Sequence, residues 1–405
     1  MRLIINIFIM LFLADASLSL FDDLLSLFMH NPLSSGLRNL LAGLTVLSAL
    51  PVSLVMIIDR RMPKWRLMAM VVFLYFSFIA GWLFPSLFSQ RMPVLFLSTL
   101  QLLIAISPYS PFTNQERTLL IPAASLQGPV FSWKHSLTAL LTCLPLLLVI
   151  LTTGILATAD SYARQLTAGF MRIAPTGILM SDRTYASGNK HIRLISMIHI
   201  GEQTYYDSLF STSFAAGTIV LAEGVTDKNR HLRQGMDYSK MAGLLGVSSQ
   251  HHMRLEGRQI VPAEIGRPNR DRQYSQRLVP DILRADTDVS GFRPKTIAFL
   301  NQAGRHMQDS SMSFGQSMRA VNNWSRENMD EADNRAVMED IIFSRNRVVI
   351  GYLDRVLPHY DHIIIPWGAL HMAEIEQAVL KRGFKPVAGS ERVSMDFWKL
   401  ARQKL

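Results

Sequence analysis

Three ionisable side chains stand where strands of this sequence are predicted to end. His199 closes one strand, Glu223 closes the next, and His371 follows a third after a short turn. In open α/β sheets, functional groups gather beyond the carboxyl ends of the strands, so we expect these side chains to meet if the strands are neighbours. Two imidazoles and one carboxylate can bind a divalent metal ion with open positions. They can equally serve as a metal-free general acid and base.

Each of these residues also has a purely structural interpretation. A histidine at a strand end is more often a hydrogen-bonded packing residue than a ligand, and Glu223 before Gly224 can simply cap a turn. His371 is followed three residues later by Glu374, either a first-turn residue favoured by the helix dipole or a further ligand on the same helix face. The recurrence of His199, Glu223 and His371 at the same kind of position favours a shared site.

Short β-type runs alternate with helical stretches around these residues, and the alternation predicts an α/β domain with a mainly parallel sheet. The expected strands are 191–200, 217–225 and 362–367, with later strands in FKPVAG and RVSMDFWKL; the expected helices are 205–214, 329–357 and 371–382. Gly383 follows the last of these helices, where a left-handed residue commonly ends a helix. The stretch 228–345 is predicted to be mainly helical and polar.

The charge density changes abruptly along the chain. Of its 405 residues, 18% are charged and 49% hydrophobic, whereas soluble domains carry about a quarter charged residues. Residues 1–158 hold 9 basic and 5 acidic side chains, and residues 159–405 hold 32 and 26. We therefore predict an all-α membrane domain over 1–158, a linker over 159–189 and the α/β domain over 190–405. A single cysteine excludes a disulfide framework.

The first part of the chain is predicted to carry about four transmembrane helices. Crossing a bilayer takes about 20 apolar residues, and the candidate runs are 37–58, 67–88, 136–158 and the shorter 92–107. An earlier run, 3–13, is too short to span alone, and we expect the following LSLFDDLLSLFMH to lie at the interface as an amphipathic helix. The predicted partner of this half is the lipid bilayer.

Basic residues in the short loops predict the orientation, because they favour the cytoplasmic side. The densest cluster lies between the first two spans and consists of Arg60, Arg61, Lys64 and Arg66. With that loop in the cytoplasm, the fourth span leaves the α/β domain outside. We therefore expect an integral protein of a bacterial cytoplasmic membrane, with its soluble domain on the extracytoplasmic side.

Several segments of the second half resemble the TraB/PrgY/GumN family. The resemblance lies in IRLISMIHIGEQTYYDSLF, TIVLAEGVTD and SRNRVVIGYLDRVLPHYDHIIIPWGALHMAEIEQAVLKRGFKPV, and more weakly in YSKMAGLLGVSSQ and RADTDVSGF. The family carries two Gly-x-x-His motifs and a glutamate after the first. Gly368 to His371 matches the second motif, Glu223 matches the glutamate, and the first motif ends at His199 but begins with Ser196 in place of glycine. The resemblance covers roughly residues 190–390.

The resemblance implies a metal-dependent hydrolase, by analogy with the TIKI proteases a peptidase, within a fold group that includes ChaN-like and erythromycin-esterase-like proteins. It implies that His199, Glu223 and His371 hold manganese, cobalt or zinc, with Glu223 a ligand or the base for the attacking water. A nearby cation would stabilise the oxyanion of the scissile carbonyl. Arg345 is our candidate for it, and a helix-surface salt bridge is the alternative.

Other classes of function find less support in the sequence. No G-x-S-x-G, H-E-x-x-H, G-x-G-x-x-G or Walker A sequence occurs, so the α/β-hydrolase, zincin and nucleotide-binding motifs are missing. The basic residues form no stripe with stacking aromatics, which argues against nucleic acid as a partner. Besides a metal-dependent peptidase, two functions stay open: a regulatory protein that sequesters a peptide without catalysis, and a metal-free esterase-like hydrolase.

Overall fold

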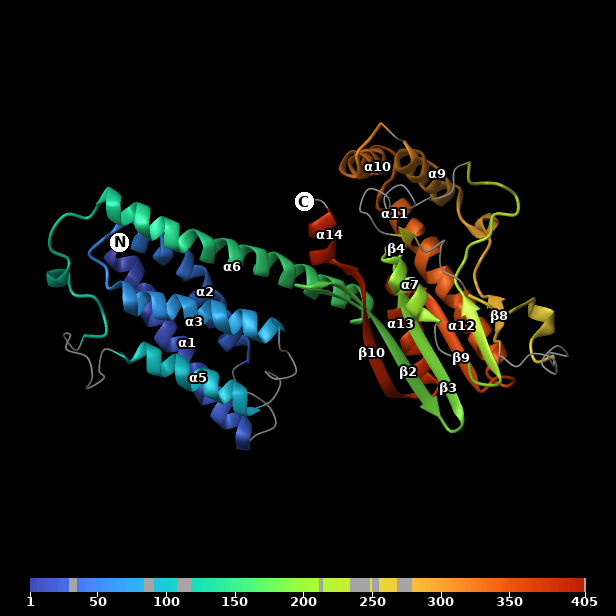
Figure 1. Cartoon of the computed structure of the whole chain (residues 1–405), viewed down its shortest axis with the longest axis horizontal. Coiled ribbons are helices and arrows are strands. Elements are labelled where there is room, and N and C mark those ends of the chain that lie inside the picture. The colour runs from blue at the N-terminus through green and yellow to red at the C-terminus, as the bar shows by residue number, and fades with distance from the viewer. Residues whose placement is uncertain are drawn as a thin grey trace. The chain divides into compact units, whose positions relative to one another are not determined.

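The structure, a computed structural model, describes residues 1–28, 35–83, 91–107, 118–210, 214–233, 248–249, 255–267, 279–309 and 311–403. The chain forms two compact units, Met1–Ile155 and Leu156–Leu405, and the boundary falls within three residues of the predicted change in charge density. Figure 1 shows the helices of the first unit in blue to green and the sheet of the second in green to red.

The described part of the first unit is helical. Its helices are α1 (Arg2–Phe28), α2 (Ser35–Ile58), α3 (Lys64–Leu83), α5 (Arg91–Ala105) and α6 (Trp133–Thr167), the last of which continues into the second unit. Two stretches are long and apolar enough to cross a membrane, Arg2–Ser26 and Gly36–Ile58, and Met92–Ala105 is a shorter apolar helix. The expected runs 67–88 and 136–158 fall largely within α3 and α6, and residues 84–88 lie outside the described part.

The beginning of the chain differs from the prediction. The sequence led us to expect a short apolar run and a separate interfacial helix, but α1 is one continuous helix of 27 residues. The two acidic residues within the second segment, Asp22 and Asp23, form ion pairs with Arg38 of α2 at 3.1 and 2.7 Å. Because a partner on α2 compensates these charges, the helix can continue through a segment that looks amphipathic in isolation.

The second unit contains an eight-stranded mixed sheet with the order β1-β2-β3-β9-β5-β8-β7, in which β10 also pairs with β2. Its strands are β1 (Met171–Ala174), β2 (Gly177–Ser187), β3 (Lys190–Met197), β5 (Thr218–Ala222), β7 (Arg258–Ile260), β8 (Asp281–Arg284), β9 (His362–Gly368) and β10 (Lys385–Asp396). The five strands from β3 to β7 are parallel, and the pairs made by β2 are antiparallel. The prediction of an α/β domain with a mainly parallel sheet is confirmed.

Four strands of the eight-stranded sheet lie where the sequence predicted none. The predicted linker 159–189 contains β1 and β2, and the stretch 228–345, predicted to be mainly helical, contains β7 and β8, which pair with each other and through β8 with β5. In β2 the central Ser181 and Asp182 are buried, so its pattern departs from the alternation by which a strand is recognised. At the other end of the chain, the two expected late strands form the single strand β10, except that residues 397–400 of the second belong to the helix α14 (Phe397–Gln403).

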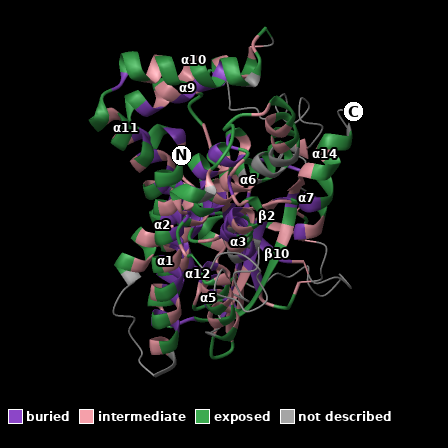
Figure 2. Ribbon diagram, turned by 90° about the vertical axis from the view of Figure 1, so that its left-hand side faces the viewer, coloured by how far each residue is buried: buried purple, intermediate pink, exposed green. Residues whose placement is uncertain are grey.

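Apolar side chains cover both faces of the sheet. One core joins Ile192, Leu221 and Ile365 of the strands to α12 (Ser344–Val356) and α13 (Ala369–Lys381), and the other packs Ile195 and Val220 against α7 (Gln203–Leu209). The helices α10 (Phe314–Asn328) and α11 (Glu331–Met338) are mostly exposed, and α9 (Pro294–Gln308) is largely exposed or half-buried, as the green and pink colours of Figure 2 show. The sheet is therefore packed against α7 on one face and against α12 and α13 on the other.

Candidate active site

The three predicted site residues follow three parallel strands that lie side by side. The strand β9 pairs with β3 on one side and with β5 on the other. Glu223 comes directly after β5, His371 lies in the first turn of α13 after β9, and His199 comes two residues after β3. The structure brings Glu223 and His371 together: the Oε1 atom of Glu223 lies 3.7 Å from the Nε2 atom of His371.

His371 is buried, with 4% of its surface exposed. Its Nδ1 atom lies 2.7 Å from the Oδ1 atom of Asn346, and its ring meets that of Trp367 edge-on at 5.1 Å. Since an amide oxygen only accepts hydrogen bonds, Nδ1 carries the proton. Burial lowers the pKa of His371 from 6.5 to about 4. At neutral pH the ring is therefore uncharged, and the lone pair of Nε2 faces the Nη1 atom of Arg345 at 3.3 Å.

Glu223 is held at both oxygens of its carboxylate. Oε2 accepts a hydrogen bond from the backbone N–H of Gly368 at 2.8 Å, and Oε1 accepts one from Arg345 at 2.7 Å. A β-carbon added to Gly368 would lie 3.5 Å from the His371 ring and 3.6 Å from Oε2, which is ordinary contact. Gly368 thus contributes its N–H, and this last residue of β9 fixes the carboxylate directly before α13 begins.

Arg345 is buried beside Glu223 and His371 and does not lie on the helix surface. Only 8% of Arg345 is exposed, and its guanidinium contacts Glu223 and also Asp286, at 3.0 Å to Oδ1 and 2.8 Å to Oδ2. Burial by itself lowers the pKa of Arg345, but the hydrogen bonds and charges of Asp286 and Glu223 outweigh it and raise the pKa. The guanidinium is therefore charged and neutralises one of two buried carboxylates.

The sequence analysis did not single out Asp286. Its side chain is fully buried and accepts hydrogen bonds from Arg345 and from the backbone N–H groups of Gly224 and Thr287. Asp286 follows β8 as Glu223 follows β5, so the same strand-end criterion would have found it had β8 been recognised. It holds the loop after β5 and the guanidinium in one arrangement.

A π-helix sets the position of Arg345 on its helix. The chain passes from α11 into the π-turn Glu339–Phe343 and then into α12. The buried Asp340 in this turn accepts hydrogen bonds from the backbone N–H of Arg293 and the hydroxyl of Thr296 at the start of α9. Since such a turn adds a residue to the helical repeat, it decides which side chains of α12 face the sheet.

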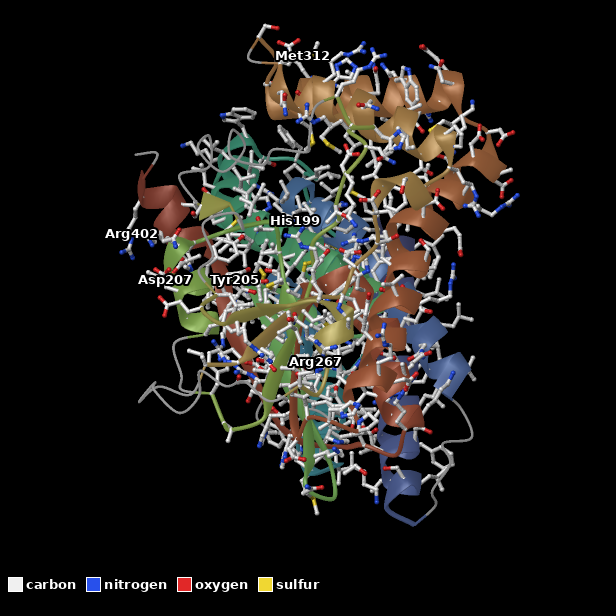
Figure 3. The ribbon with its side chains drawn as sticks, turned by 90° about the vertical axis from the view of Figure 1, so that its right-hand side faces the viewer. His199, Tyr205, Asp207, Arg267, Met312 and Arg402 are labelled. Carbon is white, nitrogen blue, oxygen red and sulfur yellow. The ribbon has the colours of Figure 1, made fainter. Side chains whose placement is uncertain are left out.

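His199 occupies a different environment from the other two predicted residues. It is exposed, and its charge contributes to lowering the pKa of His371. The end of β3 that carries it is held by α7, whose Tyr205 and Tyr206 donate hydrogen bonds to the carbonyl groups of Ser196 and Ile198 at 2.8 and 2.7 Å. Figure 3 labels His199 and Tyr205 in this region.

The residues fit a divalent ion in part. The Nε2 atom of His371 is a suitable metal ligand. The Oε1 atom of Glu223 lies 3.7 Å from it, a separation that two metal–ligand bonds of about 2.1 Å can span. However, Arg345 donates to Glu223 and lies 3.3 Å from Nε2, so its guanidinium stands at these lone pairs. No group of three or more His, Cys, Asp or Glu side chains with a ligand arrangement occurs among the described residues.

Comparison with protein-family models, with curated proteins and with solved structures found no match to this chain.

Proposed function

We propose that this chain is a membrane-anchored hydrolase, peptidase-like in its reaction, whose centre is the pair His371 and Glu223. One observation carries the proposal: an uncharged histidine and a carboxylate lie 3.7 Å apart at the ends of adjacent parallel strands. A general base near neutral pH needs an unprotonated nitrogen at the reacting position, and Nε2 of His371 supplies one. Membership of the TraB/PrgY/GumN family is part of this proposal.

In the metal-dependent form, His199, Glu223 and His371 hold manganese, cobalt or zinc. When bound, such an ion lowers the pKa of a coordinated water from about 15.7 to near 7. Glu223 and His371 offer donor atoms 3.7 Å apart, and the exposed His199 would supply the third donor. This form requires Arg345 to withdraw from Nε2 and Oε1 while keeping its two hydrogen bonds to Asp286.

A metal-free form is the second candidate, and the position of Arg345 favours it. The guanidinium already supplies a positive charge between Glu223 and His371. In this form Nε2 of His371 takes the proton from the attacking water, and Arg345 offsets the negative charge that develops on the substrate. His199 at the rim then serves as a second proton donor or acceptor.

A combined metal and activity experiment separates these forms. The full chain, purified in detergent, is equilibrated with manganese, cobalt and zinc, washed, analysed for bound metal and assayed against a mixed peptide library with and without a strong chelator. We expect cleavage by the wild type, none by His371→Gln, and normal cleavage by the control His359→Gln, because His359 lies in an exposed turn.

The outcome decides among the three functions. Bound metal with chelator-sensitive cleavage supports the metal-dependent hydrolase, and chelator-resistant cleavage supports the metal-free one. A folded wild type that neither cleaves peptides or esters nor depends on His371 contradicts the hydrolase and supports the peptide-sequestering protein.

The proposed location is an integral membrane protein with about four spans, formed by α2, α3, α5 and α6. Two stretches have the length and composition of a span, Arg2–Ser26 and Gly36–Ile58, and the first of these adds a candidate that the sequence analysis did not count. We retain the extracytoplasmic side of a bacterial cytoplasmic membrane as the proposed side for the hydrolase unit, on the distribution of basic residues in the loops.

A further inference from the structure

The half-buried Glu374 and the buried Asn346 form a chain of hydrogen bonds behind His371. The Nδ2 atom of Asn346 donates to the Oε2 atom of Glu374 at 2.7 Å, and the Oδ1 atom of Asn346 lies 2.7 Å from Nδ1 of His371. Asn346 is on α12 and is fully buried, while His371 and Glu374 are on α13, three residues apart and on one face. The proposed hydrolase mechanism makes no use of Glu374.

The carboxylate of Glu374 determines which group donates in each of these hydrogen bonds. A carboxylate has no proton to give, so the group of Asn346 that faces Glu374 is its NH₂. Its oxygen is then the group that faces His371, and an oxygen at Nδ1 requires the imidazole proton there. The lone pair of the neutral ring is thereby placed on Nε2, where Arg345 and Glu223 lie at 3.3 and 3.7 Å.

Without Glu374, neither Asn346 nor His371 would by itself determine which end of the Asn346 amide faces the imidazole. The amide of Asn346 is nearly symmetric in shape, and a half-turn would present its NH₂ to Nδ1. The imidazole would then carry its proton on Nε2, and this nitrogen would face the N–H of Arg345 as a second donor.

We propose that Glu374 is a positioning residue, which through Asn346 fixes His371 in the tautomer protonated on Nδ1. Its value to catalysis rests on the proposed function of His371, but the tautomer itself does not. A second, purely structural role is to join α12 to α13, and the two roles make different predictions when the polarity at position 374 is changed.

Nitrogen NMR of the histidine side chains tests the proposal. The full chain is labelled with ¹⁵N-histidine and reconstituted in lipid bilayers at pH 7. The signals that are missing from the spectrum of His371→Gln are assigned to His371. We expect the wild type and Glu374→Gln, which keeps an acceptor, to carry the proton on Nδ1. We expect Glu374→Lys, which offers only donors, to turn the amide of Asn346 and move the proton to Nε2.

Gln377→Ala, an exposed change on the same helix, is the control and should leave the proton on Nδ1. A wild type protonated on Nε2, or a folded Glu374→Lys that keeps the Nδ1 proton, overturns the proposal. If Glu374→Lys does not fold, Glu374→Ala decides: a signal that stays wholly Nδ1-protonated contradicts the role, and a mixture of tautomers supports it. Peptide cleavage is assayed separately, so its absence would refute the hydrolase without touching this result.

Discussion

At the scale of single residues, the site is a compact arrangement of opposite charges around one neutral ring. Arg345 satisfies two carboxylates whose side chains are almost completely buried, Glu223 and Asp286. Removing one partner of a buried ion pair leaves an uncompensated charge and costs about 3–5 kcal/mol. His371 is kept uncharged because burial outweighs the attraction of these carboxylates. The reactivity of the site therefore depends on the environment of each group more than on its type.

The pKa of His371 predicts how the stability of the unit depends on pH. The unfolded chain binds a proton on this residue below pH 6.5, whereas the folded chain does so only below about 4. The neutral ring therefore makes its full contribution to the free energy of unfolding above pH 6.5. This contribution falls by about 3 kcal/mol as the pH decreases from 6.5 to 4. Chemical unfolding of the detergent-solubilised chain measures this slope. His371→Gln should reduce it, Gln377→Ala at an exposed position of α13 should not, and equal slopes would contradict the assignment.

Ser196 predicts a substitution that stabilises the protein. It lies three residues before His199 and is buried, and its hydroxyl finds no hydrogen-bond partner among the described residues. Because an unpaired buried hydroxyl is unfavourable, Ser196→Ala should raise the free energy of unfolding by about 1 kcal/mol. Ser394→Ala is the matched control, since the buried Ser394 hydroxyl donates to the carbonyl of Ile178 at 3.1 Å. A loss of stability in both variants would contradict the prediction.

At the scale of elements, each strand end is fixed by a neighbour distant in sequence. The carbonyl groups at the end of β3 accept from tyrosines of α7, and Trp367 at the end of β9 donates its indole N–H to the carbonyl of Leu221 in β5 at 3.0 Å. The long pair of β10 with β2 closes the antiparallel side of the sheet. These contacts hold the ends of β3 and β9 on which the site is built.

The start of β2 predicts a severe defect on adding a single methyl group. Gly177 has φ +155°, and a β-carbon there would lie 2.0 Å from the carbonyl oxygen of Met395 in β10. Gly177→Ala should therefore separate β2 from β10 and cost on the order of 4 kcal/mol or more. In Gly188→Ala the added atom meets nothing within 4 Å, so only backbone strain of about 1–2 kcal/mol remains. Thermal unfolding compares them, and similar losses would show that β10 moves freely.

At the scale of the whole molecule, an apolar helical unit is joined to an α/β unit whose fraction of charged residues is that of ordinary soluble domains. The helix α6 continues from the first unit into the second, so a membrane location of the first unit would hold the second at the bilayer. A hydrolase attached in this way would meet substrates that are themselves at the membrane. The attachment would by itself limit the range of substrates to those located at the membrane.

The proposed orientation predicts the behaviour of a fusion at the C-terminus. In bacterial cells, alkaline phosphatase fused after Leu405 should be active and a green fluorescent protein at the same position should be dark, because the fourth span would carry the α/β unit outward. The same reporters placed in the loop 59–63, which the basic residues assign to the cytoplasm, should give the opposite result. A fluorescent C-terminal fusion would reverse the proposed topology.

The sequence by itself determined the division of the chain, the α/β class and two members of the site. Charge density and the alternation of strands and helices are local properties, and His371 and Glu223 are recognisable because each follows a run that forms a strand. The length of α1 was misjudged for a related reason: Asp22 and Asp23 look like the polar face of an interfacial helix until their partner Arg38 is known.

Only the tertiary structure decided how the site is assembled. Arg345 reaches Glu223 across 122 residues and Asp286 across 59, and β9 enters the sheet between β3 and β5 although it follows them by more than a hundred positions. The tautomer of His371 depends on an amide from a different helix. Hydrogen bonds and ion pairs of this kind depend on which groups burial brings within about 3 Å, and no periodicity along the chain encodes that distance.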